Sequence, residues 1–135
     1  RFKSSIVSKD EKESGLRAIL NLGHTTGHAI ESLTSYKKYS HGEAVAMGLV
    51  IALEISVKKL EFNVAKRNEI IDVMKKYKLP ISIHENPVDV LKHMKHDKKN
   101  KGDKLQFVLL RGIGMPLFNI EIKKEDVLNV LKKWT

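Results

Sequence analysis

The sequence contains no cysteine, so no disulfide can form and any bound metal would be held by His, Asp or Glu. Aromatic residues make up only 6% of the chain, which favours a helix-rich core of Leu, Ile, Val and Ala over a β-sandwich. No apolar run approaches the roughly 20 residues that span a bilayer, and the N-terminus lacks the pattern of a signal peptide. We therefore expect a soluble, cytoplasmic protein with no membrane partner.

The length of 135 residues suits one domain and is short for a two-domain enzyme. Because the chain begins with Arg1 and not with Met, we expect that a further part precedes it. The formal net charge is +9, but much of it comes from Lys residues scattered along predicted exposed helix faces. Since no groove-reading motif accompanies this charge, we expect no nucleic-acid partner, and a small anionic substrate explains the surplus equally well.

Hydrophobic periodicity and capping residues predict a mainly α fold, a multi-helical domain over residues 1–135 with a small two-stranded β element near the C-terminus. Gly23 is the expected position of a bend in the first helix, and either Ser40 or His41 should begin the second, which is apolar on most sides and should be central. The predicted helices cover residues 14–35, 41–59, 63–77, 87–94 and 124–134, and the predicted strands cover residues 105–110 and 117–122.

A stripe of polar residues follows one face of the first predicted helix. Its members are spaced four or three residues apart, so they line a face roughly 80° wide while apolar residues occupy the rest of the circumference. Burying such groups is unfavourable unless something polar lies against them, and the stripe should therefore line a cavity. The stripe consists of Arg17, Asn21, His24, His28 and Glu31.

His24 and His28 are four residues apart, a spacing that lets two imidazoles reach one metal ion. A bare pair of this kind is more often simply exposed to solvent. Gly23 and Gly27 favour a site, because glycine destabilises a helix and implies that another backbone or a ligand approaches closely. His41 adds a third imidazole at the start of the next helix, although it could equally be an ordinary residue of a helix terminus.

The remaining polar candidates are weaker. Glu43 could simply meet the dipole of the helix that follows Ser40. The Lys-rich run 96–102 is an ordinary polar loop or a loop that closes over a phosphate or carboxylate. Three further histidines lack an apolar frame and should be solvated: His84, His93 and His96.

Four stretches together resemble the successive signatures of 3-dehydroquinate synthases. They are Leu-Asn-Leu-Gly-His-Thr-Thr-Gly-His-Ala-Ile-Glu at 20–31, His-Gly-Glu-Ala-Val-Ala-Met-Gly at 41–48, Asp-Lys-Lys at 97–99 and Phe-Val-Leu-Leu-Arg-Gly-Ile-Gly at 107–114. The resemblance covers essentially the whole chain, in order and with compatible spacings. It implies the mainly helical C-terminal domain of a shikimate-pathway lyase of aromatic amino acid biosynthesis.

Members of this family convert 3-deoxy-arabino-heptulosonate 7-phosphate into 3-dehydroquinate and phosphate, with catalytic NAD and a divalent metal, usually zinc, with cobalt as another candidate. The resemblance makes His24 and His41 metal ligands, and the third ligand is a Glu upstream of this segment. His28 matches a substrate-contacting catalytic residue instead of a ligand. The other positions that match catalytic or substrate-binding residues are Lys3, Arg17 and Asn21, and one of Lys98 and Lys99, with Lys98 slightly favoured, matches a further substrate contact.

The chain also departs from the family. It has no Gly-rich turn after a strand, so the N-terminal NAD-binding domain is absent and is an expected partner, alongside a homodimer. The isolated chain should therefore be inactive. Three alternatives are another sugar-phosphate cyclase such as 2-deoxy-scyllo-inosose synthase, a metal-dependent polyol dehydrogenase, and a non-catalytic basic interaction module. Lys3, Arg17 and Asn21 follow the dehydroquinate synthase pattern, which argues against another sugar-phosphate cyclase. The run 21–31 argues against a polyol dehydrogenase. The presence of both His24 and His41 argues against a non-catalytic module.

Overall fold

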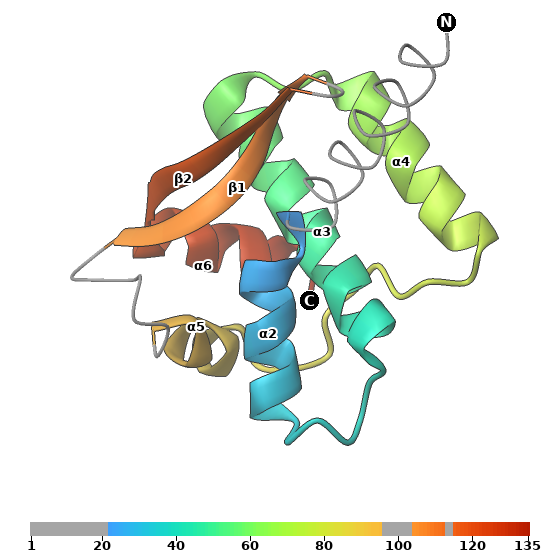
Figure 1. Cartoon of the computed structure of the whole chain (residues 1–135), viewed down its shortest axis with the longest axis vertical. Helices are drawn as coiled ribbons and strands as arrows, with labels where there is room; N and C mark the ends of the chain where they lie inside the picture. Colours follow the sequence, from blue (N-terminus) through green and yellow to red (C-terminus); the bar gives the residue numbers. More distant parts are fainter. Residues whose placement is uncertain (1–21, 96–103, 113–114) are drawn as a thin grey trace, which may run out of the picture.

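A computed structural model of the chain describes residues 22–95, 104–112 and 115–135. Within these ranges five helices and one antiparallel pair of strands follow one another, as predicted for a mainly α domain (Figure 1). Their bounds are α2 (His24–Leu33), α3 (His41–Leu60), α4 (Val64–Lys76), α5 (Pro87–Lys95), β1 (Lys104–Gly112), β2 (Met115–Lys123) and α6 (Lys124–Lys133). None of the helices in these ranges is long and apolar enough to cross a bilayer.

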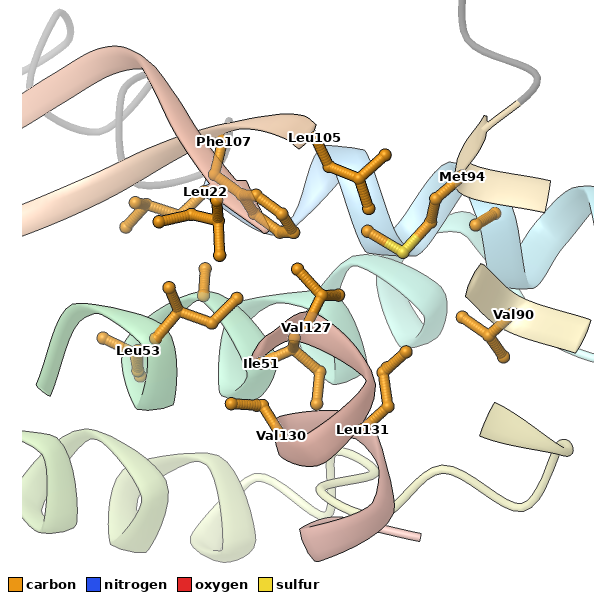
Figure 2. Packing of buried hydrophobic residues seen from close by; sticks show 14 of the residues in the cluster. Leu22, Ile51, Leu53, Val90, Met94, Leu105, Phe107, Val127, Val130 and Leu131 are labelled. Atoms are coloured by element: carbon orange, nitrogen blue, oxygen red, sulfur yellow. The ribbon is translucent and has the colours of Figure 1, made fainter. Parts of the chain in front are cut away.

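Helix α3 lies at the centre of the fold, which confirms the expectation from its apolar sequence. It contacts α2, α4, α6 and β1, whereas α5 packs on α2 and α6 (Figure 1). Ile51 and Leu53 are completely buried, and Figure 2 shows Ile51 next to Val127 of α6. Burial of such side chains contributes roughly 1.5–3 kcal/mol each, so the core around α3 is the main source of stability.

Local capping residues set the helix starts where the sequence predicts them. Ser40 accepts a hydrogen bond from the backbone N–H of Glu43, and the Glu43 carboxylate accepts one from the N–H of Ser40, so both halves of a capping box are present. Asn63 caps α4 through the N–H of Lys66. The first predicted helix is described only from residue 22 onward, and its helical turns are interrupted at Gly23, where the bend was expected.

The two strands form a hairpin whose inner face covers α3 and α6. Leu105, Phe107 and Leu109 are buried and alternate with the less buried Gln106 and Val108, which is the period of a half-buried strand. The pairing shifts register between Phe107 and Leu109, opposite Asn119, whose φ of 56° lies in the left-handed region that Asn tolerates. Ile122 of β2 is buried in the core, whereas Met115 and Phe118 of the same strand are exposed.

Two buried polar groups link the central helix to its neighbours. Ser56 donates to the carbonyl of Ala52 and accepts from the N–H of Leu110, which ties α3 to β1. Glu54 is 1% exposed and accepts hydrogen bonds from Arg67 of α4 and Lys133 of α6. Burial alone raises the pKa of Glu54, but the hydrogen bonds from Lys133 and Arg67 outweigh it and hold the pKa below its ordinary value.

Candidate functional site

Helices α2 and α3 cross at three glycines, where the two backbones touch. A Cβ atom on Gly48 would lie 2.1 Å from the carbonyl oxygen of Gly23 and 2.8 Å from the nitrogen of Gly27. A Cβ on Gly23 would lie 2.2 Å from the carbonyl oxygen of Val45. The glycines beside the histidines therefore serve the close approach of another backbone, one of the two reasons the sequence predicted for them.

This crossing brings three imidazoles together. The ring centres of His24 and His28 are 5.3 Å apart, those of His24 and His41 are 5.6 Å apart, and those of His28 and His41 are 6.1 Å apart. His24 and His28 come from successive turns of α2, and His41 is the first residue of α3. Two predicted stripe residues thus meet the third histidine at one end of the helix pair.

Glu31 lies beneath these rings. Its Oε1 atom is 2.9 Å from Nδ1 of His41 and 3.8 Å from Nδ1 of His28. The Glu31 side chain is 10% exposed, whereas those of His28 and His41 are 62% and 59% exposed. A buried carboxylate therefore lies against two imidazoles that are open to solvent in the described part of the chain. The sequence placed Glu31 on the polar stripe but did not identify this contact.

The electrostatic environment favours neutral imidazole at His24. Burial is the largest cause that lowers the pKa of His24, and the neighbouring imidazoles of His28 and His41 lower it further, while Glu31 acts in the opposite direction. A neutral ring offers a nitrogen lone pair, which is the form that binds metals or accepts a proton.

The segment that leads into His41 is held at two points. Tyr39 donates its hydroxyl to the carboxylate of Glu85, and Lys38 forms an ion pair of 2.7 Å with the same group. Immediately afterwards the Ser40–Glu43 capping box fixes the first turn of α3. The role of Glu43 that was left open is thus capping. Glu85 was missed by sequence reasoning, because it is far from His41 along the chain and belongs to no motif.

Other predicted site residues fall outside the described ranges, namely Lys3, Arg17, Asn21, Lys98 and Lys99, together with His96. His84 is exposed, as expected for a solvated histidine. His93 differs from that expectation. It is partly buried, and its Nδ1 lies 3.1 Å from the Ser32 hydroxyl oxygen, because α5 packs against the outer side of α2.

The histidine pair fits part of a divalent metal site. Two imidazoles on one tetrahedral ion, with metal–nitrogen bonds of about 2.1 Å, hold their ring centres about 5 Å apart, close to the 5.6 Å between His24 and His41. Imidazole nitrogen suits zinc and cobalt. Within the described ranges no group of three or more His, Asp or Glu side chains converges on a metal position. A complete site would need a ligand from elsewhere.

The fold is similar to part of a solved sugar-phosphate cyclase. A crystal structure of 2-deoxy-scyllo-inosose synthase complexed with carbaglucose-6-phosphate, NAD+ and Co2+ superposes with a TM-score of 0.74 at 25% identity, over 85% of this chain and 34% of that chain. A second structure of 2-deoxy-scyllo-inosose synthase gives a TM-score of 0.69 at 22% identity, over 85% of this chain and 32% of that chain, which shows the fold alone.

Comparison of the sequence with known proteins identifies the family. The family model "3-dehydroquinate synthase C-terminal" matches residues 1–100. The chain is 53% identical over 133 residues to 3-dehydroquinate synthase of Leptospira interrogans and 44% identical over 134 residues to that of Campylobacter concisus. It therefore belongs to the 3-dehydroquinate synthase C-terminal domain family. Each alignment covers 98% of this chain but only 37% and 39% of the respective relative, which is a longer protein.

Proposed function

We propose that this chain is the metal- and substrate-binding part of an enzyme that converts 3-deoxy-arabino-heptulosonate 7-phosphate into 3-dehydroquinate and phosphate. The observation that carries the proposal is the meeting of His24 and His41, from different helices, at 5.6 Å between ring centres. Membership of the 3-dehydroquinate synthase family supports the substrate. The reaction belongs to the shikimate pathway of aromatic amino acid biosynthesis, and we propose a cytoplasmic location, in keeping with a sequence without cysteine.

In this proposal His24 and His41 hold a divalent ion, zinc or cobalt, with a Glu from an upstream part of the protein as third ligand. A bound ion would polarise oxygens at the reacting carbon, and NAD held by an upstream domain would supply reversible hydride transfer. His28 lies beside this pair with an exposed ring, where it can contact substrate. The cations Lys3 and Arg17, the amide of Asn21 and one of Lys98 and Lys99 bind the carboxylate and phosphate of the substrate.

The test uses the full-length protein that carries this domain, supplied with NAD, Zn2+ or Co2+ and the heptulosonate phosphate. Phosphate release and 3-dehydroquinate formation are measured together. His24→Ala and His41→Ala should each lower turnover by more than about 100-fold, since loss of an outer-shell partner alone weakens a metal site by 10–100-fold. His84→Ala, at an exposed histidine that is not one of the three clustered imidazoles, is the matched control. Wild-type-like turnover by either ligand variant contradicts the proposal.

A second candidate is a cyclase that acts on a hexose phosphate, because the structural likeness to 2-deoxy-scyllo-inosose synthase extends over 85% of the chain. Such a substrate lacks the carboxylate. The same assay with a hexose 6-phosphate in place of the heptulosonate decides between the two, and we expect turnover only with the carboxylate-bearing substrate. We also propose that the enzyme works with its NAD-binding domain and as a homodimer, and that the isolated 135-residue chain turns over neither substrate.

A further inference from the structure

We propose that Glu31 is a positioning residue for His41, and that its carboxylate holds the imidazole as the Nδ1–H tautomer with Nε2 directed to the metal. The inference rests on the proposed function, because it concerns a residue that acts through a proposed ligand. Three observations support it: the contact itself, the burial of Glu31, and the place of Glu31 in its helix.

The contact has the geometry of a charge-assisted hydrogen bond. Nδ1 of His41 and Oε1 of Glu31 are 2.9 Å apart. A carboxylate accepts hydrogen bonds and donates none, so the proton in this bond belongs to Nδ1. A neutral imidazole carries one N–H, and Nε2 therefore keeps its lone pair. Histidines that bind metals commonly donate their other N–H to a carboxylate in this way, which fixes both the tautomer and the orientation of the ring.

Burial makes Glu31 the fixed partner of this pair. The Glu31 side chain is 10% exposed and lies on α2, which is locked to α3 through Gly23, Gly27 and Gly48. The His41 side chain is 59% exposed and would otherwise be free to turn in solvent. An immobile acceptor beneath an exposed ring limits that rotation, so the direction of Nε2 is set before any ligand arrives.

The position of Glu31 in the helix argues against a purely structural role. It lies in the last turn of α2, which carries no basic residue, and a negative charge at the C-terminal end of a helix opposes the helix dipole. Burial of a charge is unfavourable as well unless it is paired. Both the unfavourable helix dipole and the burial of charge occur at the position where Oε1 of Glu31 lies 2.9 Å from Nδ1 of His41 and 3.8 Å from Nδ1 of His28. Glu31 thus fixes the proposed ligand beside the residue proposed to contact substrate.

The experiment combines a tautomer measurement with metal affinity in the full-length protein. Imidazole ¹⁵N–¹H correlation spectra of the metal-free protein, at a pH where the rings are neutral, report which nitrogen of His41 carries the proton. We expect Nδ1–H in the wild type. Competition with a chelator then gives the affinity for Zn2+, which Glu31→Ala should weaken by about 10- to 100-fold. Glu31→Gln, whose amide oxygen can still accept from Nδ1, should restore the tautomer and most of the affinity.

Glu43→Gln is the matched control. It removes a carboxylate two residues from His41, keeps a side-chain oxygen that can complete the capping box of the same helix, and leaves the acceptor of Nδ1 in place. It should change neither tautomer nor zinc affinity. An Nε2–H tautomer in the wild type overturns the inference, and this readout needs no variant to fold. Unchanged zinc affinity in Glu31→Ala also overturns it, whereas failure of the wild type to bind zinc or turn over substrate refutes the proposed function instead.

Discussion

Replacement of Gly48 by Ala is the sharpest test of how the histidines are brought together. Alanine normally stabilises the interior of a helix by up to about 1 kcal/mol relative to glycine. At Gly48 the added methyl would lie 2.1 Å from the carbonyl oxygen of Gly23, whereas such contacts are essentially never closer than 3.0 Å. The two helices must therefore move apart by about 1 Å, because both sides of this contact are backbone.

The expected loss of stability follows from that separation. Insertion of a methyl group into a packed interface destabilises a protein by about 1–3 kcal/mol, and a gap of 0.5–1 Å loses a quarter to a half of the dispersion energy of the atoms around it. After subtraction of the gain in helix propensity, we expect Gly48→Ala to lower the free energy of unfolding by about 2 kcal/mol. For a chain of this length that corresponds to a melting temperature lower by roughly 5–10 °C.

Gly42→Ala provides the matched control, since it lies on the same helix and its added methyl meets nothing within 4 Å. Urea and thermal unfolding of wild type and both variants are compared, with Zn2+ affinity of the full-length protein measured in parallel. Gly42→Ala should equal or exceed the wild type in stability, while Gly48→Ala loses both stability and zinc affinity. If both Gly42→Ala and Gly48→Ala raise the free energy of unfolding, the close crossing of α2 and α3 does not require glycine at position 48.

Three further predictions concern stability. Glu54→Gln should lower the free energy of unfolding by about 3 kcal/mol at neutral pH. Since the pKa of Glu54 is held below its ordinary 4.5, the ionised group stabilises the fold fully above pH 4.5, and the difference between variant and wild type in urea unfolding should shrink as the pH falls below that value. Ser56→Ala leaves the N–H of Leu110 without its acceptor and should cost about 1–3 kcal/mol, with faster amide exchange at Leu110. Ser40→Ala removes the N-cap of α3 and should cost about 1 kcal/mol in thermal unfolding.

Sequence reasoning located the helix boundaries well because they depend on neighbours in the chain. Ser40 and Asn63 cap helices through N–H groups three residues away, and Asn86 accepts from the N–H of Val88 at the start of α5. The centrality of α3 was predictable for the same kind of reason, since apolar residues occupy most of its circumference. The change of hydrophobic periodicity likewise predicted a strand over residues 105–110, which lies within β1.

The contacts that join distant parts of the chain could not be predicted. No sequence motif marks Glu54 or Arg67, and only the packing of α4 and α6 on α3 reveals a buried carboxylate with two cationic partners. Glu85 near Tyr39 and His93 near Ser32 are similar cases, with more than 40 residues between the partners. A pattern in one segment says nothing about a partner whose position depends on the whole fold.

The histidine cluster could be predicted from the sequence only in part. The spacing of His24 and His28 is local, whereas the approach of His41 depends on the angle and separation of two helices. Here the separation is itself encoded by glycines within four residues of the histidines on α2, because a backbone contact requires that no Cβ be present on either side. In the proposed enzyme the two histidine ligands are thereby aligned before a metal binds. Only the side chain of the upstream ligand then loses conformational freedom when the site is completed, which lowers the entropic cost of metal binding.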